Sequence, residues 1–118
     1  MAKRVLIVDD NPNMSSLLAE MLEVFDCDSD LADDGHQALT KLEGGQFSMI
    51  ITDMRMPNMT GMELLKQVKS KYPNLPVVLI SGYSGGQIEA EAELAAADGF
   101  LGKPLMMSDL QKLVEDLL

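Results

Sequence analysis

The sequence has no tryptophan, a single cysteine and few basic residues. With Cys27 alone, no disulfide can form within the chain, which is typical of proteins in a reducing compartment. Lys and Arg total 9 against 19 Asp and Glu, so the net charge is −10. Nucleic acids are bound through a basic face, so we expect this chain to make no direct contact with nucleic acid. The charge favours bound cations or a basic partner instead.

Long hydrophobic runs are also absent. No stretch approaches the roughly 18 apolar residues of a membrane-spanning helix. The apolar run near the N-terminus, Val5 to Val8, ends at two aspartates and is too short for the core of a signal peptide. We therefore expect a cytoplasmic protein with no membrane association. The length predicts a single domain over residues 1–118.

Short apolar runs alternate with segments of helical periodicity along the chain. The predicted strands cover residues 4–9, 27–32, 47–53, 77–81 and 99–103. The predicted helices begin at 12, cover 35–42, follow 61, lie around 87–97 and follow Ser108. Asn11 and Ser108 are the predicted N-caps of the first and last helices, and the spacing places Leu17 among the buried residues. This alternation predicts βαβ units and a doubly wound α/β fold around a parallel sheet.

Polar side chains stand where the predicted strands end. They are Asp9 and Asp10 at the end of the first strand, Asp53 at the end of the third, Ser81 at the end of the fourth and Lys103 at the end of the fifth. The carboxyl ends of parallel strands meet at one edge of a sheet, so we expect these groups to converge. Three neighbouring carboxylates repel one another, and a hard divalent cation is their natural counterion. The sequence therefore predicts a Mg²⁺ site, with Mn²⁺ as the second candidate.

A lysine, a hydroxyl and a metal around one carboxylate predict phosphoryl chemistry. Lys103, Ser81 and the cation could each neutralise oxygens of a phosphoryl group arriving on Asp53. Aspartate is a known nucleophile that forms aspartyl-phosphate. Taken singly, each feature also has an ordinary structural explanation. Two aspartates after a strand often belong to the start of a helix, and Lys-Pro or a terminal serine usually belongs to a turn. Their joint placement at four strand ends predicts that Asp53 is phosphorylated.

The segments that carry these residues resemble the receiver domains of two-component response regulators. VLIVDDNP, IITDMRMPNMTG, VLISGY and DGFLGKP occur in the order and at the spacing of that CheY-like family, and the similarity covers essentially all 118 residues. It implies a flavodoxin-like, five-stranded parallel sheet in the order 2-1-3-4-5 with five helices. It also implies a phosphorylation-operated signalling switch, which is no enzyme beyond catalysing its own phosphorylation and dephosphorylation.

The resemblance implies a role for each acid. Asp53 would accept a phosphoryl group from a phosphohistidine on a sensor histidine kinase or on a histidine phosphotransfer protein. Asp10 would bind Mg²⁺ directly and Asp9 mainly through water. Asp53 and the backbone carbonyl of Arg55 would complete the ligands that the protein supplies.

The resemblance also implies how the signal spreads. Lys103 would pair with the phosphoryl group, next to a cis peptide bond between Lys103 and Pro104. Ser81 would move to a phosphoryl oxygen, and Phe100 would turn inward as Ser81 moves. The surface of the fourth helix, fifth strand and fifth helix would change and control an output domain or a target protein.

A few positions tune or depart from the family pattern. Arg55 and Tyr83 lie two residues after the phosphoacceptor and the serine, where the family varies, and we expect them to flank the path of attacking water. Thr60 stands where an acid is frequent and Leu105 where phenylalanine is frequent. We expect neither change to abolish phosphorylation.

Three other functions fit parts of the sequence. A degenerate receiver could serve as a constitutive docking domain, although the complete set of acids, serine and lysine argues against it. A small Mg²⁺-dependent phosphatase acting through an aspartyl-phosphate usually carries a second acid two residues after the nucleophile, where this chain has Arg55. A flavodoxin-like cofactor binder needs a phosphate-binding loop rich in Gly or Ser after the first strand, and none is present there.

Overall fold

The computed structural model describes residues 3–56, 58–81 and 97–118. The elements in this part of the chain are β1 (Lys3–Val8), α1 (Pro12–Glu23), β2 (Cys27–Ala32), α2 (Gly35–Gly44), β3 (Met49–Asp53), α3 (Gly61–Lys71), β4 (Val77–Ser81), β5 (Gly99–Gly102) and α5 (Met107–Leu117). The helix predicted around 87–97 lies outside the described residues, except for its last residue.

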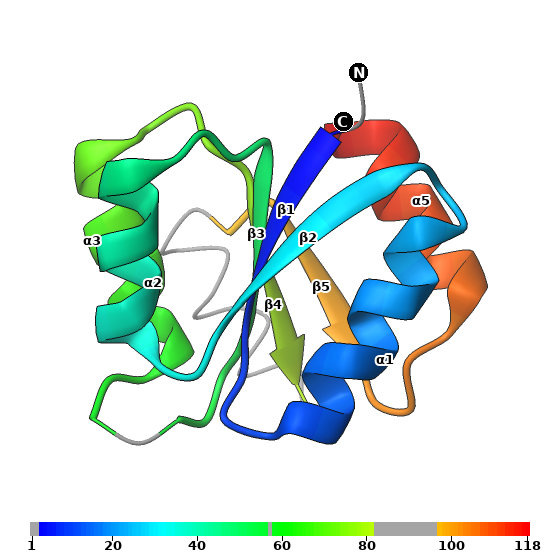
Figure 1. Ribbon diagram of the computed structural model, residues 1–118, viewed down its shortest axis with the longest axis horizontal. Helices are drawn as coiled ribbons and strands as arrows, with labels where there is room; N and C mark the ends of the chain where they lie inside the picture. Colours follow the sequence, from blue (N-terminus) through cyan, green and yellow to red (C-terminus); the bar gives the residue numbers. More distant parts are fainter. Residues whose placement is uncertain (1–2, 57, 82–96) are drawn as a thin grey trace.

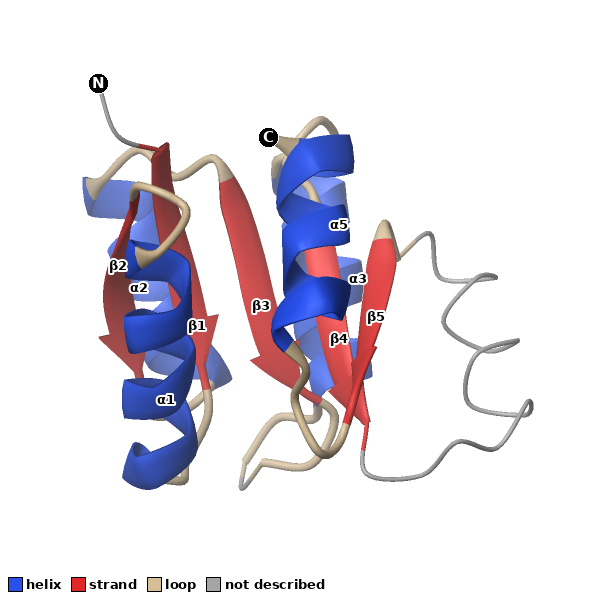
Figure 2. Cartoon of the chain, turned by 90° about the vertical axis from the view of Figure 1, so that its right-hand side faces the viewer, coloured by secondary structure: helices blue, strands red, loops and turns tan. Residues whose placement is uncertain are grey.

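The five strands form one parallel sheet in the order β2-β1-β3-β4-β5, which confirms the predicted flavodoxin-like fold. The polar strand β2 lies at an edge of the sheet, as its composition predicts. All strand arrows in Figure 2 point to the same edge. Groups that follow β1, β3, β4 and β5 are therefore delivered to one side of the molecule.

Helices cover both faces of the sheet. Figure 1 shows α2 and α3 on one face and α1 and α5 on the other. Alternate residues of β1 serve the two cores, since Leu6 packs on the α2–α3 side and Val5 and Ile7 pack on the α1–α5 side. All five residues of β3 are buried, because helices cover both faces of the sheet at its central strands. Each large aliphatic side chain buried in this way contributes about 1.5–3 kcal/mol to folding.

The caps decide where the helices begin. The Asn11 side chain accepts a hydrogen bond of 3.0 Å from Asn13 N, and Pro12 opens α1, as predicted. The prediction that Ser108 caps α5 is wrong. Leu110 N–H donates to the carbonyl of Met106 at 3.1 Å, so the helix begins earlier and Ser108 lies inside its first turn.

The buried face of α1 is narrower than the apolar spacing predicts. Leu18, Met21 and Leu22 fill the contact with the sheet. Leu17 is 44% exposed, so its predicted burial is wrong. Ser15 is buried instead, with its hydroxyl donating to the carbonyl of Asn11 at 3.3 Å. No helix in the described part of the chain is long and apolar enough to cross a membrane.

Candidate functional site

Three carboxylates meet at the carboxyl edge of the sheet. Asp9 and Asp10 follow the last residue of β1, and Asp53 is the last residue of β3. The parallel register pairs Val8 with Thr52, so the residues that follow them, Asp9 and Asp53, emerge next to each other. One carboxylate oxygen from each of the three acids lies within 4.8 Å of the others. The structure thus brings together the acids that the strand-end argument predicted to converge.

Asp9 is buried with half of its carboxylate unpartnered. Its Oδ1 accepts a hydrogen bond from Asn11 N at 2.9 Å, whereas its buried Oδ2 has no hydrogen-bond partner among the described residues. Burial raises the pKa of Asp9; the Asn11 amide and Lys103 oppose this rise, and the charges of Asp53 and Asp10 add to it. A buried carboxylate oxygen without a donor needs an explanation, and a bound cation supplies one. The donor set, three carboxylates with one oxygen unpartnered, fits a hard divalent metal ion.

Asp53 is held by one amide and one cation. Its Oδ1 accepts a hydrogen bond from Arg55 N at 3.2 Å, and its Oδ2 lies 3.4 Å from Lys103 Nζ. The Asp53 side chain is 11% exposed and the Lys103 side chain 35%. Charge-assisted hydrogen bonds are usually 2.7–2.9 Å long, so this pair is loose. Lys103 directly follows β5 and precedes Pro104 through a cis peptide bond.

The remaining predicted residues are described only in part. The backbone of Ser81 pairs with Gly102 at the end of the β4–β5 ladder, while its side chain lies outside what the structure describes. Tyr83 lies outside the described residues altogether. Phe100 is partly buried against the core on the α2–α3 side. The roles of these residues stay predictions.

Two features of the site were not predicted from the sequence. The Arg55 amide contacts Asp53, whereas the sequence directed attention to the Arg55 carbonyl. The second feature is the close approach of Gly61 to the backbone of Asp53. Residue type and spacing gave no signal for that approach, because it depends on the path of the backbone between β3 and α3.

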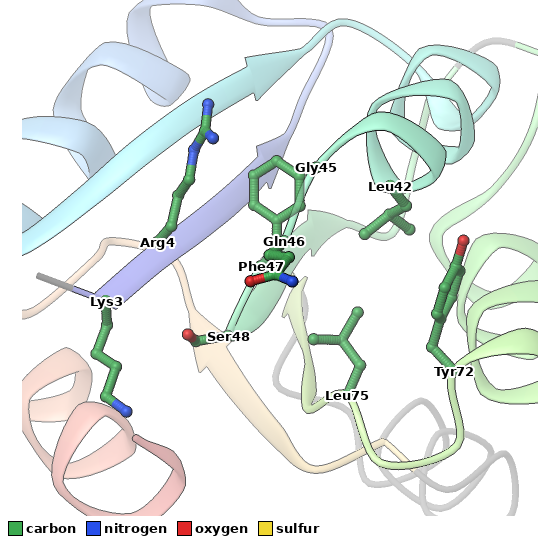
Figure 3. Close-up of a pocket in the computed structure, with 9 residues that line it drawn as sticks. All are labelled: Lys3, Arg4, Leu42, Gly45, Gln46, Phe47, Ser48, Tyr72 and Leu75. Carbon is green, nitrogen blue, oxygen red and sulfur yellow. The ribbon is translucent and has the colours of Figure 1, made fainter. Parts of the chain in front are cut away.

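A cavity of about 660 Å³ lies next to the amino ends of β1 and β3, whereas the acid cluster lies at the carboxyl ends of these strands. Figure 3 shows the side chains that line the cavity. The cavity is lined by Lys3, Arg4, Leu42, Gly45, Gln46, Phe47, Ser48, Tyr72 and Leu75. The Arg4 guanidinium lies 5.1 Å from the centre of the Phe47 ring and also pairs with Asp30 at 3.3 Å. None of the residues that line the cavity belongs to the acid cluster, so the cavity has no part in its chemistry.

Comparisons with known proteins agree with this geometry. A family model described as the response regulator receiver domain matches residues 5–115. The transcriptional regulatory protein ZraR of Klebsiella oxytoca is 33% identical over 114 residues, which cover 97% of this chain and 26% of that protein. This chain thus spans about a quarter of the length of that relative.

Two chemotaxis proteins match over nearly their whole length. CheY of Pseudomonas aeruginosa is 32% identical over 117 residues, covering 97% of this chain and 94% of that protein. The solved structure of CheY4 from Vibrio cholerae superimposes with a TM-score of 0.92 at 30% identity, covering all of both chains. Receiver domains are signalling domains that act as phosphorylation switches and interact with histidine kinases and output domains. With the family model matching residues 5–115, this chain belongs to the response regulator receiver domain family.

Proposed function

We propose that Asp53 is the phosphoacceptor of a Mg²⁺-dependent signalling switch. The observation that carries the proposal is the contact between Lys103 Nζ and Asp53 Oδ2 at 3.4 Å inside the acid cluster. Asp9 is 1% exposed and Asp10 is exposed, and among the described residues neither forms an ion pair with that lysine. Asp53 alone combines the lysine contact with partial access to solvent.

The transfer would be a direct displacement at phosphorus. A carboxylate oxygen of Asp53 attacks the phosphorus of a phosphohistidine, the phosphorus–nitrogen bond breaks, and its electron pair returns to the imidazole. The new phosphorus–oxygen bond gives an aspartyl-phosphate. Lys103 stabilises the charge on the phosphoryl oxygens, because an ammonium group in a partly buried site interacts strongly with an anion.

The metal would be held by Asp9, Asp10 and Asp53, with the Arg55 carbonyl as a further ligand. The Oδ2 atom of Asp9, which has no hydrogen-bond partner in the part of the chain that the structure describes, supports this assignment. Mg²⁺ suits oxygen ligands and an open site, and Mn²⁺ is the second candidate. When bound, the cation supplies neutralising charge to the acids and to the incoming phosphoryl group.

The switch would be read out on β5 and the elements next to it. Ser81 ends β4 and pairs with Gly102, while Phe100 pairs with Leu79 on the same two strands. A movement of Ser81 towards the phosphoryl group would therefore act on the strand that carries Phe100, whose ring is only partly buried. We assign Arg55 and Tyr83 to tuning the lifetime of the phosphoryl group.

The partners would be a phosphodonor and a responder. The donor is a sensor histidine kinase or a histidine phosphotransfer protein. The responder is an output domain or a separate target, as expected for a domain similar both to a transcriptional regulatory protein and to a chemotaxis protein. Binding of the phosphoryl group shifts a pre-existing equilibrium by its differential affinity for the two states.

Intact mass spectrometry tests the proposal. After incubation with Mg²⁺ and acetyl phosphate, the chain should gain one phosphoryl group, about 80 Da, with acetate as the leaving group. Asp53→Asn should gain nothing, and Asp30→Asn, a matched aspartate outside the cluster, should behave like the wild type. No gain in the folded wild type would sink the proposal and favour a constitutive docking domain.

A further inference from the structure

The first turn of α3 lies directly on the backbone of the residue that we propose as phosphoacceptor. A Cβ atom at Gly61 would lie 2.3 Å from the carbonyl oxygen of Asp53, 3.0 Å from its carbonyl carbon and 2.9 Å from Cα of Met54. Real Cβ atoms essentially never approach other atoms within 3.0 Å. These three atoms belong to the backbone, so a change of side-chain rotamer cannot relieve the clash. Close approach, and not a positive φ, is what requires glycine here.

The peptide unit between Asp53 and Met54 has little room to retreat. Met54 N donates to the carbonyl of Ile80 in β4 at 3.1 Å, and Gly61 N donates to the carbonyl of Met54 at 3.0 Å. The Thr52 hydroxyl donates to the carbonyl of Asp53 at 3.1 Å. A side chain at position 61 must therefore break this network, move α3, or move Asp53.

The geometry points to Gly61 as a positioning residue for the carboxylate of Asp53, an inference that rests on the proposed function. The two hydrogen bonds of that carboxylate, to Arg55 N and Lys103 Nζ, are already long at 3.2 and 3.4 Å. A small backbone displacement would break either of them and would alter the spacing of the acid cluster. A misplacement of about 1 Å in a reacting group can cost roughly 100-fold in rate.

Other glycines of the chain provide matched controls. A Cβ at Gly44 meets nothing within 4 Å. A Cβ at Gly35 would lie 2.5 Å from Sδ of Met59, a side-chain sulfur that accepts from Gln67 Nε2 at 3.9 Å. Thr60→Ala removes the N-cap of α3, whose hydroxyl accepts from Glu63 N at 3.1 Å, without adding an atom next to Asp53.

The experiment compares Gly61→Ala with Gly44→Ala, Gly35→Ala and Thr60→Ala. Three quantities are measured: the rate of phosphoryl gain from acetyl phosphate per folded molecule, the Mn²⁺ affinity by electron paramagnetic resonance, and the free energy of unfolding in urea. Gly61→Ala should lower the rate at least ~10-fold and weaken Mn²⁺ binding. Gly35→Ala and Thr60→Ala should lose stability while keeping the wild-type rate and Mn²⁺ affinity.

Each other outcome is decisive. Wild-type rate and Mn²⁺ affinity in folded Gly61→Ala would overturn the inference, and so would equal losses in Gly35→Ala or Thr60→Ala. A Gly61→Ala chain that does not fold would also overturn it, because the glycine would then serve the fold and not the placement of Asp53. If the wild type takes up no phosphoryl group but Gly61→Ala still weakens Mn²⁺ binding, the placement of Asp53 stands and the proposed function fails.

Discussion

Two aspartates on neighbouring strands, Asp30 in β2 and Asp9 after β1, differ in what surrounds their charge. Asp30 lies 2.8 Å from Lys41 Nζ and 3.3 Å from the Arg4 guanidinium. The hydrogen bond from Lys41 is the main reason that the pKa of Asp30 lies below its ordinary value. Asp9 shares its site with two further acids, and burial raises its pKa.

The difference distinguishes a carboxylate that stabilises the fold from one that binds a ligand. A carboxylate such as that of Asp30 is neutralised by basic side chains of the same chain. A buried carboxylate among other acids raises the free energy of the folded chain until a cation binds. Asp53 is intermediate, since it has both a lysine contact and two acidic neighbours. The four predictions below test this contrast, from the largest expected effect to the smallest.

Replacing Lys103 with methionine should have the largest effect. The change removes the cation next to Asp53, and the rate of phosphoryl gain should fall about 100-fold, the scale of losing one stabilising group at a reacting centre. Lys41→Met removes the cation next to Asp30 and should leave the rate unchanged. Mass spectrometry over time measures both rates, and equal rates would show that Lys103 does not act on the phosphoryl group.

Adding Mg²⁺ should stabilise the chain against urea. At 100 times the dissociation constant, a ligand that binds only the folded state adds about 2.7 kcal/mol to the free energy of unfolding. Asp53→Asn should lose most of this gain, whereas Asp30→Asn should keep it. The measurement is a urea titration with Mg²⁺ and with a chelator, and the same gain in both variants would place the ion elsewhere.

Asp9→Asn should stabilise the metal-free chain at neutral pH. The change removes a buried negative charge from between two other carboxylates and supplies an amide N–H group that can donate to them. We expect a gain of roughly 1 kcal/mol, the scale of one net hydrogen bond. The same variant should lose most of its stabilisation by Mg²⁺. Urea unfolding in the presence of a chelator measures the first effect, and a loss of stability there would mean that the Asp9 charge is satisfied.

Asp30→Asn should have the smallest effect and the opposite sign. The Asp30 side chain is 31% exposed, so its ion pairs should contribute less than about 1 kcal/mol at neutral pH. Because its pKa is lowered, this contribution is complete above the ordinary value of 3.8 and is lost as the pH falls through the lower pKa of the folded state. Urea unfolding across that range should show the wild type and the variant converging at acid pH.

Most strands were predictable because short runs of apolar residues indicate buried strands. One error arose where a backbone hydrogen bond outweighed residue type, and another where side-chain packing outweighed spacing. Ser108 is a good cap by type, but the bond from Leu110 to the carbonyl of Met106 sets the start of α5. Leu17 has the right spacing for burial, yet three other residues of α1 already fill the contact with the sheet.

The site was predictable as far as strand ends determine it. Asp9, Asp53 and Lys103 converge because parallel strands deliver their carboxyl ends to one edge. The unpartnered oxygen of Asp9 and the contact of Gly61 with Asp53 were not predictable, since both depend on the path of the backbone between elements. Residue type and spacing do not encode that path.

The unpartnered oxygen of Asp9 also has a consequence for evolution in the laboratory. A library of variants selected only for resistance to proteolysis should enrich neutral residues at position 9, since we predict that removing that charge stabilises the metal-free fold. Selection for signalling would act in the opposite direction at the same position. The carboxylate at position 9 is therefore a trade-off between stability and activity, and its retention in a stabilised variant would show which of the two had been under selection.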